Sequence, residues 1–258
     1  MKVERKCKIV SKEQMGDAVY MVLEAGDMVR TSFRAPGQFV HVKCGEGLLL
    51  RRPISVCTCY SDEPSDLLTI VFEVRGEGTD WLARRPVGHS LDVLGLAGNG
   101  FTMKPEGRYL LVGGGIGIPP MLGCAQYTGG RATAILGGRS RDKIILEDFF
   151  REDCAKVLCA TDDGSLGHHG FVDALVRREL SEDRGYDGVL ACGPKPMLRN
   201  VAKVAEEFGI PCQVSMEERM GCGVGACLVC ACDMADGSRK HVCKDGPVFD
   251  SREVDWDA

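Results

Sequence analysis

Four cysteines close to the C-terminus constrain this chain more than any other feature of its sequence. They are Cys222, Cys227, Cys230 and Cys243. Three of them form the pattern C-x4-C-x2-C and the fourth follows after a gap, which is the plant-type spacing of ligands for a [2Fe–2S] cluster. Glycines within 221–225 let the backbone fold tightly and bring amide groups close to the sulfurs. The sequence therefore predicts a one-electron carrier.

Two other uses of cysteine explain this pattern less well. Structural zinc usually shows two C-x2-C pairs or a cysteine–histidine mixture, whereas this stretch has one C-x2-C and no paired histidine nearby. A disulfide scaffold would need a larger share of cysteine than 14 among 258 residues. Cys232, two residues past Cys230, is left out of the predicted ligand set.

Length and composition narrow the class of protein. A chain of 258 residues has room for about two domains and a small appendage. The net charge of −5 gives no electrostatic reason to expect a nucleic-acid partner. No apolar run approaches the ~20 residues that span a membrane, and the N-terminus lacks the apolar stretch of a secretion signal. The other ten cysteines are scattered, as expected of buried thiols in a reducing cytoplasm.

Residues 1–103 predict a small antiparallel β-barrel. Short segments rich in β-branched residues alternate with turn signals, and strands at this interval are typical of such barrels. The expected strands are 7–10, 19–24, 39–43, 54–59, 67–74 and 90–94. A helix is expected to follow Gly78, with Thr79 or Asp80 as its cap.

Residues 104–211 predict an α/β domain with a parallel sheet, because short apolar strands alternate with helical stretches. The expected strands are 108–112, 132–136, 156–160 and 188–192, and the expected helices are 121–127, 146–150, 171–180 and 195–208. Residues 212–258 are too few for an independent core. We expect bound metal to hold this last domain folded, with loops and one short hairpin.

Two turns in the α/β domain are candidate nucleotide-binding sites, because each follows a predicted strand. Backbone N–H groups and a helix N-terminus at such a turn can face a pyrophosphate. The first turn lacks the Rossmann spacing, so a purely structural turn remains an alternative. In the second, the thiol either approaches a nicotinamide or is a buried core group. The turns comprise Gly113, Gly114, Gly115 and Gly117, and Cys192, Gly193 and Pro194.

The predicted barrel holds two further candidate sites. The run Arg52-Pro53-Ile54-Ser55 combines a guanidinium, the preferred partner of phosphate, with a hydroxyl that can donate to a ring nitrogen. Gly78 and Thr79 lie at a possible helix start, which also suits phosphate. Either stretch alone is equally compatible with an ordinary turn between strands.

Together, and in this order, these motifs resemble the ferredoxin–NADP reductase superfamily. Residues 52–55 resemble its flavin signature, although Pro53 and Ile54 stand where the superfamily often has an aromatic residue. The turns at 113–117 and 192–194 look like its pyridine-nucleotide motifs. Residues 217–227 and 242–249 resemble, more narrowly, the electron-transfer subunits of type B dihydroorotate dehydrogenase. The resemblance extends over essentially the whole chain.

This resemblance implies an FAD-binding barrel, an NAD-binding α/β domain and a C-terminal [2Fe–2S] domain. Residues 52–55 would contact the flavin, with Ser55 near its reactive nitrogen. Val71, Phe72 and Glu73 would line the flavin, and Gly78 and Thr79 would hold its pyrophosphate. A partner subunit containing FMN would oxidise dihydroorotate to orotate for pyrimidine synthesis, two copies of each subunit forming a heterotetramer.

Electron counting supports this set of cofactors. Hydride transfer moves two electrons and a cluster carries one, whereas a flavin can exchange either number. No residue of this chain is then expected to act as a general acid or base. Residues 137–142 do not decide between NAD and NADP, and NAD is chosen on the resemblance. Two alternatives stay open: a subunit of an NADH-dependent ferredoxin–NADP reductase or sulfhydrogenase, and a redox sensor without flavin.

Overall fold

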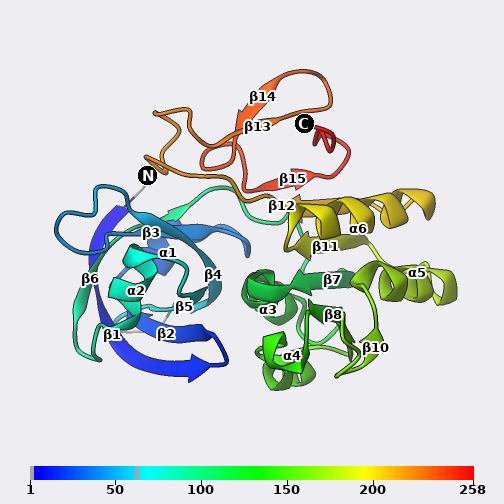
Figure 1. Cartoon of the computed structure of the whole chain (residues 1–258), viewed down its shortest axis with the longest axis horizontal. Helices are drawn as coiled ribbons and strands as arrows, with labels where there is room; N and C mark the ends of the chain where they lie inside the picture. Colours follow the sequence, from blue (N-terminus) through cyan, green and yellow to red (C-terminus); the bar gives the residue numbers. More distant parts are fainter. Residues whose placement is uncertain (1–2, 62–63) are drawn as a thin grey trace.

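The computed structural model describes residues 3–61 and 64–258. Figure 1 shows a β-barrel beside an α/β domain, with the C-terminal segment crossing the top of both. In the described residues, no helix is long and apolar enough to cross a membrane. The multi-domain β and α/β architecture predicted from the sequence is confirmed.

Six antiparallel strands close the N-terminal barrel in the order β1-β2-β5-β4-β3-β6. These strands are β1 (Val3–Met15), β2 (Ala18–Glu24), β3 (Phe39–Val42), β4 (Arg52–Tyr60), β5 (Leu67–Glu73) and β6 (Ser90–Ala97). Apolar side chains from alternate positions, among them Ile9, Met21, Ile70 and Phe72, fill its interior. All six predicted strands are present, and β1 is considerably longer than expected.

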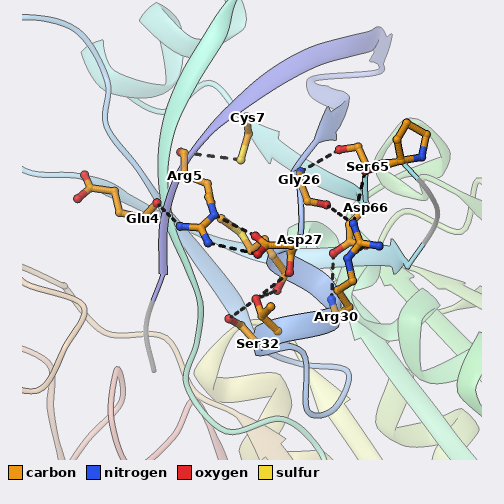
Figure 2. Close-up of polar contacts among 12 residues, drawn as sticks. Glu4, Arg5, Cys7, Gly26, Asp27, Arg30, Ser32, Ser65 and Asp66 are labelled. Atoms are coloured by element: carbon orange, nitrogen blue, oxygen red, sulfur yellow. Dashed lines mark hydrogen bonds and ion pairs between the residues drawn. The ribbon is translucent and has the colours of Figure 1, made fainter.

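A short helix, α1 (Met28–Ser32), is tied to the barrel by polar contacts (Figure 2). The Asp27 carboxylate accepts a hydrogen bond from Nε of Arg5 at 3.0 Å. The fully buried Asp66 accepts one from the main-chain N–H of Arg30 at 2.9 Å. These contacts fix the chain between β2 and β3, where the buried Gln38 then donates to the carbonyl oxygen of Gly98 at 3.2 Å.

The second barrel helix, α2 (Glu77–Ala83), begins earlier than the sequence predicted. Gly76, not Thr79 or Asp80, is its N-cap. The Thr79 hydroxyl instead lies in the first turn and accepts the N–H groups of Arg75 at 2.9 Å and Gly76 at 3.2 Å. A threonine hydroxyl inside the first turn can accept main-chain N–H groups as an N-cap side chain does. This explains why the sequence placed the start of the helix too late.

The α/β domain is built on a seven-stranded sheet in the order β10-β9-β8-β7-β11-β12-β15, parallel except for β15. Its strands are β7 (Tyr109–Gly114), β8 (Thr133–Gly138), β9 (Lys156–Thr161), β10 (His168–His169), β11 (Gly188–Cys192), β12 (Cys212–Ser215) and β15 (Val248–Asp250). Its helices are α3 (Ile118–Thr128), α4 (Glu147–Asp153), α5 (Val172–Glu182) and α6 (Lys195–Glu207), with single 3-10 turns η1 (Gly115–Gly117) and η2 (Arg141–Lys143).

The two faces of this sheet have different partners. Leu110 and Val112 of β7 pack with side chains of α5 and α6, whereas Leu111 packs with those of α3 and α4. The second of these cores also contains Cys57 and Val71 of the barrel, and the first contains Phe39 and Ala97, so both cores include barrel residues. These shared cores place the carboxyl end of β7 close to the barrel.

The C-terminal segment is joined to the α/β sheet by two of its strands. Its first strand, β12, pairs with β11, and β15 pairs with β12, so both lie in the seven-stranded sheet. Between them, β13 (Ala231–Asp233) and β14 (Arg239–His241) form the one expected hairpin. Val242 and Phe249 belong to the same core as α5 and α6. Apolar packing against the sheet therefore stabilises this segment, in addition to any bound metal.

Candidate cofactor and electron-transfer site

Residues 216–247, the segment between β12 and β15 that we call the cysteine loop, bring the four predicted ligand cysteines together. Main-chain N–H groups point at their sulfurs: Gly225 donates to Sγ of Cys243 at 3.1 Å, and Cys243 to Sγ of Cys230 at 3.4 Å. Cys222 donates to Sγ of Cys227 at 3.3 Å. Sγ of Cys222 itself accepts from Val224 at 3.4 Å, Ala226 at 3.2 Å and Cys227 at 3.4 Å.

These contacts fit an iron–sulfur cluster, because N–H groups aimed at thiolate sulfurs are the outer contacts that stabilise and tune such clusters. Desolvation raises the pKa of Cys222, but the N–H groups of its own loop outweigh it and lower the pKa to about 6. Burial, together with neighbouring Cys230, raises the pKa of Cys243 to about 12. Since ligand thiols must be deprotonated, loading the site releases protons.

Cys232 lies outside this group. It is buried on β13, and its Sγ is 3.8 Å from the carbonyl oxygen of Asp233. Within residues 3–61 and 64–258, no three His, Cys, Asp or Glu side chains are arranged around a position for a single metal ion. The sequence-based choice of four thiols without Cys232 stays a prediction that this geometry supports.

The barrel brings its two predicted flavin stretches side by side. A Cβ atom added to Gly78 would lie only 2.4 Å from Nε of Arg52, so the guanidinium rests directly on the start of α2. The Arg52 guanidinium also donates to the carbonyl oxygen of Leu50. A guanidinium beside exposed N–H groups is suited to a pyrophosphate, so this position fits that part of FAD.

We expect Gly78→Ala to weaken FAD binding by about tenfold, because the new methyl group must push the Arg52 guanidinium away, and charged hydrogen bonds contribute about 1.5–3 kcal/mol. Folding should be preserved, since the displaced group is the end of a flexible side chain and alanine favours helix. The measurement is fluorescence titration of the FAD-free protein with FAD.

Gly76→Ala is the matched control. Gly76 has φ of 178° and no atom within 4 Å of an added Cβ, so the same substitution two residues away disturbs nothing. Equal FAD affinity in Gly78→Ala and Gly76→Ala would contradict a flavin role for Arg52 at this place.

The other predicted flavin residues are placed unevenly. Val71 is buried at the junction between the domains, and Phe72 is buried inside the barrel. Neighbours on a strand face opposite sides, so the side chains of Val71 and Phe72 lie on different faces of β5, and their contact with a flavin stays a prediction. Ile54 lies in the barrel core, whereas Ser55 is partly exposed opposite Phe39.

The two predicted nucleotide turns meet at the carboxyl end of the sheet. β7 and β11 are neighbours, with Gly113 opposite Cys192. A Cβ atom added to Gly117 would lie 2.3 Å from the carbonyl oxygen of Cys192, and one added to Gly193 would lie 3.2 Å from Cα of Gly114. Glycine is required because the two backbones touch. Gly115 has φ of 54°, and no atom lies within 4 Å of a Cβ added to it.

The thiol of Cys192 stays protonated at neutral pH. Burial raises its pKa to about 12, and the hydroxyl of Ser215 only partly opposes this. A neutral thiol at the edge of the site can contact a ring but cannot act as a base or nucleophile there. Pro194 beside it is exposed.

The three parts of the chain meet around one cavity of about 570 Å³. Its lining comes from Arg52 and Pro53 of the barrel, Gly193 and Pro194 of the α/β domain, and residues 216–220 at the start of the cysteine loop. Sequence reasoning did not find Lys195 in this lining, because it lies one residue beyond the predicted nucleotide turn. A ligand in this cavity would lie between the flavin, nucleotide and cluster motifs.

Comparisons with known proteins agree with this arrangement. Residues 217–255 match the family model of the iron-sulfur cluster binding domain of dihydroorotate dehydrogenase B. The chain is 37% identical over 258 residues to the dihydroorotate dehydrogenase B (NAD(+)) electron transfer subunit of Caldanaerobacter subterraneus subsp. tengcongensis, covering 98% of this chain and 99% of that one. The chain belongs to this family.

Other members of the family align with nearly the whole of this chain. The electron transfer subunit of Bacillus caldolyticus is 40% identical over 257 residues, covering 95% of this chain and 96% of its own. Among solved structures, an NADH-dependent reduced ferredoxin–NADP oxidoreductase matches with a TM-score of 0.86 and 31% identity, over 98% of this chain and 91% of that one. The resemblance stated from the motifs is therefore confirmed.

Proposed function

We propose that this chain passes electrons from an FMN-containing catalytic partner, which oxidises dihydroorotate to orotate, through a [2Fe–2S] cluster and FAD to NAD⁺ in pyrimidine synthesis. The observation that supports this proposal is a cavity lined by Arg52 and Pro53 of the flavin motif, Gly193 and Pro194 of the second nucleotide turn, and residues 216–220, which precede the first cluster cysteine. Family membership supports the identity of the substrate and of NAD⁺.

The roles of individual residues follow from their places. The cluster ligands are Cys222, Cys227, Cys230 and Cys243. The flavin is bound by residues 52–55, the main chain of 71–73, Gly78 and Thr79, and the nucleotide by Gly113, Gly114, Gly115, Gly117 and the turn 192–194. We place the domains at 1–103, 104–215 and 216–258, moving the last boundary from 211 because β12 pairs in parallel with β11 of the α/β domain.

The chain's own contribution is to bind and orient. A bound flavin supplies the exchange between one- and two-electron chemistry that links a cluster to a nicotinamide. The glycines of the two turns allow a nicotinamide nucleotide to approach closely, and the N–H groups of the cysteine loop stabilise thiolate charge. No general acid or base is assigned.

The cysteine loop has features suited to docking the partner. Cys227 is exposed, and beside it Leu228 and Val229 are 61% and 56% exposed. Leu228 also has φ of 60°, a left-handed conformation that costs a leucine about 1–2 kcal/mol. Exposed apolar side chains in a strained turn next to a ligand mark a contact surface. Two copies of each subunit would form a heterotetramer, located in the cytoplasm.

One other partner has specific support. The similarity to an NADH-dependent reduced ferredoxin–NADP oxidoreductase favours a role in such a complex, with ferredoxin chemistry replacing dihydroorotate. The cofactors and site would be the same, so only the partner distinguishes the two functions.

Co-expression with an FMN-containing barrel subunit encoded nearby tests the proposal. The purified complex should reduce NAD⁺ with dihydroorotate, whereas the chain alone should be yellow-brown and oxidise NADH with an artificial acceptor only. A complex that forms but oxidises reduced ferredoxin and not dihydroorotate would support the alternative. Colourless protein without NADH oxidation would indicate the redox-sensor alternative.

A further inference from the structure

The barrel holds the cluster-binding segment by a side chain that no motif identified. Asn99 lies in the turn that follows β6. Its carboxamide Nδ2 donates to the carbonyl oxygens of Lys244 at 3.2 Å and Asp245 at 3.0 Å, and its main-chain N–H donates to the carbonyl oxygen of Gly246 at 2.6 Å. One residue of the barrel thus fixes three consecutive carbonyl groups directly after Cys243.

The turn that Asn99 contacts, residues 241–246, is also held by hydrogen bonds of its own. The N–H groups of Lys244 and Asp245 both donate to the carbonyl oxygen of His241, at 2.9 and 2.7 Å. The Asp245 carboxylate accepts the N–H of His241 at 2.7 Å. The turn therefore moves as one body that includes Cys243, and Asn99 attaches this body to the barrel.

A second contact fixes the other half of the cysteine loop. The ring of His41 on β3 is fully buried, and a Cβ atom added to Gly223 would lie 2.5 Å from its Nδ1. The backbone next to Cys222 thus rests on a side chain of the barrel. Both ends of the ligand set are positioned by the domain that carries the flavin motifs.

We propose that Asn99 is a positioning residue for the cluster: the barrel, through this carboxamide, sets the place of Cys243 and so the retention and surroundings of the iron. Outer partners of metal ligands typically change metal affinity by about 10–100-fold when they are removed. The inference rests on the ligand set proposed above.

Asn99→Asp is the direct test. A carboxylate has the same size, but it cannot donate to the two carbonyl oxygens and would repel them. Iron should be lost to a chelator about tenfold faster than from the wild-type protein, followed by the decay of cluster absorption. The visible circular dichroism and electron paramagnetic resonance spectra of the cluster should also shift, while the FAD content stays unchanged.

Gln213→Glu is the matched control. The Gln213 carboxamide joins β12 to the chain leaving the barrel, with Nε2 donating to the carbonyl oxygen of Thr102 and Oε1 accepting its N–H, both at 2.8 Å. The same amide-to-acid change therefore loosens the same junction away from the cysteines. Faster loss in Asn99→Asp alone supports the inference. Unchanged loss, or equal acceleration in both variants, overturns it.

Two further outcomes keep the test decisive. If Asn99→Asp does not fold, Asn99→Ala removes the donors without adding charge and is interpreted in the same way. If the wild-type protein, purified without oxygen, contains no cluster, the proposed function fails. A wild-type cluster with iron loss that Asn99 does not affect overturns only the inference about Asn99.

Discussion

Cys227→Ser should abolish electron transfer from the catalytic partner while leaving NADH oxidation with an artificial acceptor largely intact. A serine hydroxyl is a poor substitute for a thiolate, and Cys227 is one of four proposed ligands. The loss of electron transfer should exceed the effect of about 10–100-fold that is typical when a group bonded to a metal ligand, and not the ligand itself, is removed. Iron content, cluster absorption and the two activities are measured on the same preparation.

Cys232→Ser provides the comparison for this variant. Cys232 lies two residues past Cys230 and is buried, but it takes no part in the N–H contacts among the four sulfurs. The Cys232→Ser variant should keep its cluster and both activities. Loss of the cluster in Cys232→Ser with retention in Cys227→Ser would mean that the ligand set is wrongly drawn.

Gly117→Ala should cause a comparably selective loss at the other end of the electron path. Its methyl group would lie 2.3 Å from the carbonyl oxygen of Cys192, and main-chain atoms cannot turn aside as a side chain can. The two nucleotide turns must separate, and misplacement by about 1 Å can cost about 100-fold in rate. We expect kcat/KM for NADH with an artificial acceptor to fall by about that factor.

The cluster and flavin spectra of Gly117→Ala should remain normal, since neither set of proposed ligands includes this turn. Gly185→Ala is a suitable control in the same domain. There, the nearest atoms to an added Cβ are the side-chain ends of Arg108 and Asp183, both at 3.1 Å. If Gly117→Ala oxidised NADH as well as Gly185→Ala does, the nucleotide would have to bind elsewhere.

What could be predicted from the sequence depended on how local the signal is. The cysteine spacing identified the metal site because ligands, glycines and N–H donors lie within a few residues. The strands of the barrel were found from β-branched residues between turns, and β12 was missed because Val214 is its one β-branched residue. The burial of the Phe72 side chain inside the barrel follows from the alternation of side chains along a strand, and its flavin contact stays a prediction.

Long-range contacts were beyond the reach of sequence patterns. Asn99 looks like an ordinary turn residue between two glycines, and His41 like any polar residue in a strand. Their partners lie more than 140 residues away, at 244–245 and at Gly223. The contact of Arg52 with Gly78 was implied only by resemblance to a family, since nothing in either stretch points to the other.

The pairing of β12 with β15 has a mechanical consequence. The chain leaves the sheet at Ser215 and returns at Val248, the two residues being directly opposite each other in the pair. Both ends of the cysteine loop are therefore fixed side by side in the sheet. The loop cannot swing between donor and acceptor as a tethered carrier would. Electrons must cross a gap of constant width, and the partner has to come to the loop.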